Sequence, residues 1–98
     1  MSDLFRDQYV DLATRRERIR LFGEECLLTI PGGRLADGLT LEIGCGHGHW
    51  LTAYSESKPD DPCIGIDLIT KRIDKANSKR KKRKLPYLFF FKTEANEF

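Results

Sequence analysis

"LTLEIGCGHGHW", residues 39–50, is an aliphatic run that ends in an acid and three glycines at alternate positions. Its alternating leucine and isoleucine residues predict a short strand, and Gly44, Gly46 and Gly48 follow that strand directly. Glycine permits a tight turn and lets the backbone approach a ligand closely, at a cost in conformational entropy. We therefore expect a ligand-binding loop that begins at Gly44.

Two further apolar runs have the length of strands, "CIGIDL" at residues 63–68 and "YLFFF" at residues 87–91. A helix from about residue 48 to 58 is expected between the first two strands, because Pro59 restricts the residue before it. A second helix, with Thr70 as its N-cap, is expected to end in a basic run before Pro86. Alternation of strands and helices predicts an open α/β sheet of parallel strands with right-handed crossovers.

Residues 13–28 are predicted to form an amphipathic helix that precedes this sheet, because their apolar positions recur at helical spacing. A cluster of proline and glycine in "TIPGGRLADG", residues 29–38, indicates a link between the two. We therefore divide the chain into an N-terminal helical segment and linker, 1–38, and a sheet domain, 39–98. The apolar positions of the predicted helix are Ile19, Phe22, Cys26 and Leu27.

Length and composition limit the protein class. The 98 residues suffice for one small domain, and a content of 40% hydrophobic and 33% charged residues is typical of a folded core with a polar exterior. Three cysteines without a C-x-x-C pair favour reduced thiols. No apolar run approaches the roughly 18 residues of a membrane span. A soluble, cytoplasmic protein without membrane contact is expected.

The spacing of the loop narrows the choice of ligand. A dinucleotide fingerprint, G-x-G-x-x-G, would need glycine or alanine at position 49, where the chain has His49. Asp67 ends the second strand, 19 residues after Gly48, and is well placed to accept hydrogen bonds from ribose hydroxyls. These residues favour an adenosine ligand that lacks a pyrophosphate.

A metal site on the same loop is a weaker interpretation. Cys45, His47 and His49 carry side chains that bind zinc. Their alternate positions do not match the usual spacing of zinc ligands, and the sequence suggests no fourth ligand. No metal is therefore expected.

The motifs resemble those of a known enzyme superfamily. "LEIGCGHG" is similar to the first motif of S-adenosylmethionine-dependent methyltransferases, E/D-x-G-x-G-x-G, and "GIDL" is similar to their second motif. Together "LEIGCGHGHWL", "GIDLITKRI" and "FKTEA" resemble the bacterial tRNA (guanine-N7-)-methyltransferases over roughly residues 39–96. This resemblance implies a partial Rossmann-like methyltransferase sheet of three parallel strands, with S-adenosylmethionine as the cofactor.

The resemblance also implies roles for individual residues. Glu42 would face the methionine end of the cofactor, above a loop formed by the three glycines at 44, 46 and 48. Asp67 would bind the ribose. Glu94 lies where the family has an acid near the adenine, although that acid is usually aspartate.

One family motif is absent from these 98 residues. The P-D-P segment, which carries the aspartate at the guanine, does not occur, so the catalytic residues are expected beyond residue 98. The chain is interpreted as the N-terminal part of a tRNA (guanine-N7-)-methyltransferase, inactive on its own. Two alternatives remain open, a methyltransferase that acts on a protein or small molecule and a non-catalytic RNA-binding fragment.

An uninterrupted basic run near the end of the second crossover helix has two interpretations. It is either a solvated helix end favoured by the helix dipole, or a surface that contacts tRNA phosphates. The resemblance makes tRNA the expected partner. The run consists of Lys79, Arg80, Lys81, Lys82, Arg83 and Lys84.

Overall fold

The computed structural model describes residues 11–31 and 38–98 of the chain. Its elements confirm the predicted fold class, a parallel α/β sheet with crossover helices and a preceding helix. The predicted link at residues 29–38 falls largely outside the described residues, so the boundary at 38/39 stays a prediction. The elements are α2 (Leu12–Thr29), β1 (Thr40–Ile43), α4 (His49–Ser57), β2 (Cys63–Asp67), α5 (Thr70–Arg83) and β3 (Leu88–Lys92).

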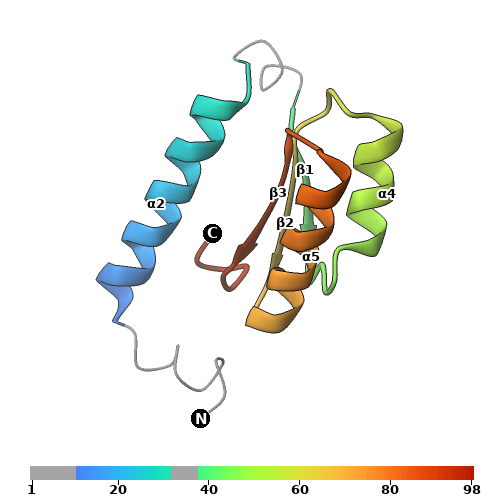
Figure 1. Ribbon diagram of the computed structural model, residues 1–98. Helices are drawn as coiled ribbons and strands as arrows, with labels where there is room; N and C mark the ends of the chain where they lie inside the picture. The colour runs from blue at the N-terminus through green and yellow to red at the C-terminus, as the bar shows by residue number, and fades with distance from the viewer. Residues whose placement is uncertain (1–10, 32–37) are drawn as a thin grey trace.

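The sheet forms the middle of three layers. Its strands run parallel in the order β1-β2-β3, with Ile43 beside Ile66 and Asp67 beside Lys92. Helix α2 lies on one face of the sheet, and α4 and α5 lie on the other (Figure 1). All three strands therefore end at one edge, the carboxyl edge, and both crossover helices begin there.

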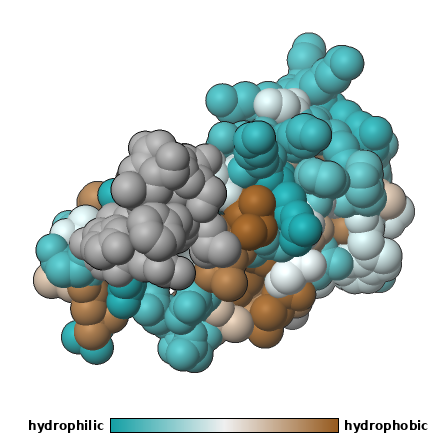
Figure 2. Space-filling model, turned by 90° about the horizontal axis from the view of Figure 1, so that it is seen from below, coloured by the Kyte–Doolittle hydropathy of each residue, from teal (hydrophilic) through white to brown (hydrophobic). Residues whose placement is uncertain are grey.

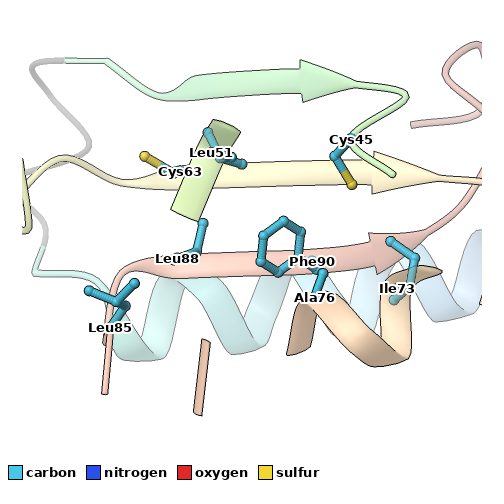
Figure 3. Close-up of a cluster of buried hydrophobic side chains, with 8 residues drawn as sticks. All are labelled: Cys45, Leu51, Cys63, Ile73, Ala76, Leu85, Leu88 and Phe90. Carbon is cyan, nitrogen blue, oxygen red and sulfur yellow. The ribbon is translucent and has the colours of Figure 1, made fainter. Parts of the chain in front are cut away.

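The core beneath α4 and α5 is organised around the ring of Phe90. A Cβ added at Gly65 would lie 2.8 Å from this ring, and one added at Gly48 would lie 2.5 Å from it. Both glycines therefore make room for one aromatic side chain, which joins β3 to β2 and to the loop after β1. The buried cluster consists of Cys45, Leu51, Cys63, Ile73, Ala76, Leu85, Leu88 and Phe90 (Figure 3).

Helix α2 packs on the opposite face through aromatic contacts. It begins at an N-cap, Asp11, whose Oδ1 accepts a hydrogen bond from the Thr14 N–H at 2.8 Å. The Phe22 ring stacks on that of Phe91 at a centroid distance of 4.4 Å, and Cys26 is buried one turn further along. No helix in the described ranges has both the length and the apolar character that a membrane crossing requires.

Two local predictions were wrong, at Leu27 and at Thr70. Leu27 is 65% exposed, because the helical period brings Phe22, Cys26 and Ile30 to the sheet and turns Leu27 away. The N-cap of α5 is Ile69, and its N–H donates to Asp67 Oδ1 at 2.9 Å. Thr70 is already helical, and its hydroxyl contacts the Lys92 ammonium. The N–H groups of Arg72 and Ile73, which a hydroxyl at an N-cap Thr70 would accept, donate to the Ile69 carbonyl instead.

Strand β1 forms one edge of the sheet among the described residues. Two of its apolar side chains remain largely accessible, with Leu41 43% and Ile43 64% exposed. An open strand edge with apolar side chains favours association with another strand.

The packing of Phe90 predicts opposite effects of the same substitution at two glycines. Gly65→Ala should lower the free energy of unfolding by about 1–3 kcal/mol, the usual cost of overpacking a core. Gly23→Ala, in α2 with nothing within 4 Å of the added Cβ, should instead raise it by about 0.5–1 kcal/mol. Denaturant unfolding measures both changes. Equal stability of Gly65→Ala and the unsubstituted protein would contradict the role of Phe90.

Candidate functional site

The loop after β1 has a backbone that requires glycine. The N–H groups of Gly44 and Cys45 both donate to the Ile66 carbonyl, at 2.8 and 3.0 Å. Gly44, Gly46 and Gly48 have φ angles of +71°, +58° and +73°, which residues with a Cβ rarely adopt. The turn therefore holds the chain against the end of β2 before α4 begins.

The three glycines face different surroundings. A Cβ added at Gly44 or Gly46 would meet nothing within 4 Å, whereas Gly48 is packed against Phe90 and Ala76. Gly44 and Gly46 thus leave open space beside the loop, where a ligand can approach the backbone. The structure gives Gly48 a packing role, and its contact with a cofactor stays a prediction.

Asp67 is the buried acid of the site and joins two loops. Its side chain is 6% exposed, and its Oδ2 accepts a hydrogen bond from the Gly46 N–H at 3.0 Å. Its Oδ1 accepts from Ile69, and Arg72 Nη1 lies 3.9 Å from Oδ2. Because a carboxylate has about four acceptor positions, Asp67 retains capacity for hydroxyl groups of a ligand. Its structural role was not predicted from the sequence.

A cavity of about 670 Å³ opens at the carboxyl edge beside Asp67. It brings together three predicted residues, Gly44, Asp67 and Glu94, while Glu42, Gly46 and Gly48 do not line it. Seen from this edge, hydrophobic side chains gather next to hydrophilic ones (Figure 2). The lining residues are Ile43, Gly44, Ile66, Asp67, Leu68, Ile69, Arg72, Thr93, Glu94, Ala95 and Asn96.

Glu42 lies near the end of β1, in register with Gly65 on the face that α4 and α5 cover. Its Oε1 is buried and has no hydrogen-bond partner in the described part of the chain. Burial raises the pKa of this carboxyl above its ordinary value. A buried acceptor without a partner suits a bound cationic or donor group, because such atoms are otherwise almost always satisfied.

The thiol of the glycine loop, Cys45, is buried. Burial, with smaller contributions from Asp67 and Glu42, raises the pKa of the Cys45 thiol to about 12, so this sulfur remains protonated. No group of three or more potential metal ligands occurs among residues 11–31 and 38–98.

Three members of the basic run have partners within the protein. Lys79 Nζ lies 2.7 Å from His49 Nδ1, Arg80 donates to the Leu88 carbonyl, and Arg83 pairs with Glu56. Lys81, Lys82 and Lys84 are exposed. The run occupies the end of α5 that points away from the carboxyl edge (Figure 1). The contact of this run with tRNA stays a prediction.

Comparison with known proteins identifies the family. Residues 36–98 match a family model described as "Putative methyltransferase". The chain belongs to this methyltransferase family. A tRNA (guanine-N(7)-)-methyltransferase from Synechococcus elongatus is 31% identical over 58 residues, which are 59% of this chain and 27% of that protein. The chain thus spans about a quarter of the length of this curated relative.

Solved structures show the same arrangement. PKMT2 from Rickettsia typhi, in complex with AdoHcy, is 25% identical with a TM-score of 0.54, covering 57% of this chain and 11% of that one. A SAM-dependent methyltransferase from Aquifex aeolicus has a TM-score of 0.53 and covers 98% of this chain and 50% of that one; at 20% identity it shows the fold alone. The predicted resemblance to S-adenosylmethionine-dependent methyltransferases is confirmed.

The raised pKa of Glu42 predicts a pH-dependent effect of Glu42→Gln on stability. An acid with a raised pKa in the folded state destabilises that state wherever it is ionised. At pH 7 the Gln variant should therefore be more stable than the unsubstituted protein. The difference should shrink once the pH falls below the raised pKa of Glu42, and it should vanish below the ordinary pKa of a glutamate, where neither state is ionised.

Urea unfolding at a series of pH values from 4 to 8 measures this difference. Glu94→Gln removes an exposed carboxylate and is the matched control, expected to change stability by no more than about 0.5 kcal/mol. A stability difference between Glu42→Gln and the unsubstituted protein that does not vary with pH would contradict the prediction.

Proposed function

We propose that this chain forms the cofactor-binding part of a tRNA (guanine-N7-)-methyltransferase. The observation that carries the proposal is the cavity at the carboxyl edge, where an open glycine turn meets the buried carboxylate of Asp67. The family membership supports methyl transfer, and the partial similarity to a tRNA methyltransferase supports tRNA as the acceptor. On this proposal the protein acts on tRNA in the cytoplasm.

The residues of the site fit S-adenosylmethionine. Asp67 has free acceptor capacity for the two ribose hydroxyls, and Gly44 leaves space where the cofactor passes the loop. Glu94 lines the same cavity and would bind near the adenine. Glu42, with its unpartnered oxygen, would take the positively charged methionine end, because the loss of one unsatisfied acceptor and the gain of an ion pair both favour binding.

Methyl transfer to guanine N7 requires the protein mainly to position the methyl donor and the acceptor. When bound, S-adenosylmethionine supplies a methyl group on a sulfonium, which guanine N7 accepts through its lone pair without losing a proton. The protein must therefore hold donor and acceptor in line and exclude water, and no strong general base is needed. Residues at the guanine are proposed to lie beyond residue 98.

Equilibrium dialysis of the protein with labelled S-adenosylhomocysteine, and separately with labelled tRNA, tests this function. Binding of both ligands is the expected result. Binding of the cofactor alone would favour a methyltransferase that acts on a protein or small molecule, and binding of tRNA alone would favour a non-catalytic RNA-binding fragment. The 98-residue chain should transfer no methyl group from labelled S-adenosylmethionine to tRNA, and rapid transfer would contradict the placement of essential residues beyond it.

Substitutions at two glycines with open surroundings distinguish the loss of a cofactor contact from the effect of backbone strain. Gly44 lines the cavity, whereas Gly38 precedes β1 at the opposite end of the strand; both have positive φ and nothing within 4 Å of an added Cβ. Gly44→Ala should weaken binding of S-adenosylhomocysteine about tenfold or more, equivalent to roughly 1.4 kcal/mol. Gly38→Ala should leave affinity within about twofold. Equal losses in the two variants would make strain, and not contact, the cause.

A further inference from the structure

One face of α5 carries a line of cations that differs from the contiguous basic run and shares only two residues with it. Arg72, Lys75, Lys79 and Lys82 follow one another at intervals of three, four and three residues. This spacing brings their side chains to the same side of the helix. At a rise of 1.5 Å per residue, the line from residue 72 to residue 82 is about 15 Å long.

This face begins at the candidate cofactor site and passes along the glycine loop. At its start, Arg72 Nη1 lies 3.9 Å from the Oδ2 of Asp67. In its middle, Lys79 Nζ donates to the His47 carbonyl at 3.3 Å and lies 2.7 Å from His49 Nδ1. The rings of His47 and His49 are both exposed and lie 5.9 Å apart. The loop thus contacts this face of α5 through Lys79, and Arg72 at the start of the face lines the cavity.

The charges on this surface are largely of one sign. Desolvation and the neighbouring cations, among them Lys75, Arg72 and Lys79, lower the pKa of His47. Lys79 contacts the His47 carbonyl and His49 Nδ1, and no carboxylate of the described residues pairs with it. Lys75 and Lys82 are exposed, and neither has an acidic partner within the described ranges.

The remaining lysines of the run lie in a different environment. Lys81 and Lys84 line a groove of about 420 Å³ between α5 and α2, to which Glu25 contributes a carboxylate. Arg83 is paired with Glu56 of α4. Carboxylates beside these residues disfavour a polyanion, which separates them from the line that starts at Arg72.

We propose that Arg72, Lys75, Lys79 and Lys82, with His47 and His49, form a phosphate track that binds the backbone of tRNA and leads it to the cofactor cavity. The inference rests on the proposed function, since it takes RNA as the partner. A row of cations about 15 Å long matches a strand of phosphates by charge and neutralises it by releasing counterions. Phosphate contacts of this kind orient the nucleic acid, while its bases are recognised elsewhere.

A matched pair of double variants tests the track. Lys75→Ala with Lys82→Ala removes two cations of the track and leaves Asp67 and the glycine loop untouched. Lys81→Ala with Lys84→Gly removes two cations from the α2 side of the same helix. Glycine is used at position 84 because Lys84 has a φ of +55°. Fluorescence anisotropy with labelled tRNA, and with an unrelated RNA hairpin, gives affinity as a function of salt concentration.

The track variant should bind tRNA more weakly, and its log–log salt slope should be smaller in magnitude by about 0.7 to 0.9 for each cation removed. The control variant should retain the slope of the unsubstituted protein, and both variants should bind S-adenosylhomocysteine normally. An unchanged slope in the track variant, or an equal loss in both variants, would overturn the track.

The same binding experiment gives a different result if the track is correct but the proposed function is wrong. Equal, track-dependent binding of tRNA and the hairpin would support the track and count against tRNA as the specific substrate. Absence of binding to either RNA would overturn both proposals, while normal binding of S-adenosylhomocysteine would leave the methyltransferase site in place.

Discussion

The ring of Phe90 occupies the space in which Gly48 and Gly65 would otherwise carry side chains, and the site depends on this contact. It brings β3, the middle strand and the loop after β1 to one point in the core. Because Gly48 is held there with a positive φ, the turn before it is directed over the end of β2. Packing on one side of the sheet thus shapes a loop whose open positions, Gly44 and Gly46, face away from the core.

Asp67 connects the packed glycine loop to the candidate ligand site. Its carboxylate accepts the Gly46 N–H from one loop and the Ile69 N–H from the other, so it spaces the two walls of the candidate site. A buried carboxylate with charge-assisted hydrogen bonds is a rigid feature, and its remaining acceptor positions are therefore pre-oriented. One acid both holds the loops and is proposed to bind the ribose.

The features that could be predicted from the sequence are those that depend on local residue patterns. Apolar runs identified all three strands, and the glycine spacing with Asp67 identified the edge at which the candidate site lies. The sequence did not predict that Gly48 serves the packing of Phe90, since residues 48 and 90 meet only through the tertiary fold. Thr70 was expected to cap α5 because propensity favours it, but Ile69 is the N-cap, and the Arg72 and Ile73 N–H groups donate to its carbonyl. The basic run likewise appears uniform in sequence, although Lys79, Arg80 and Arg83 contact different parts of the fold.

Two-dimensional amide NMR during titration with S-adenosylhomocysteine would locate the bound cofactor and so test whether it lies at the carboxyl edge. The largest shifts are expected at the N–H groups of Gly44, Gly46 and Ile69 and at residues 93–96, because these surround the Asp67 carboxylate and its cavity. Amides on α2 and at the far end of α5 should shift little. Largest shifts in the groove between α2 and α5, with the signal of Gly46 unchanged, would contradict a cofactor site at the carboxyl edge.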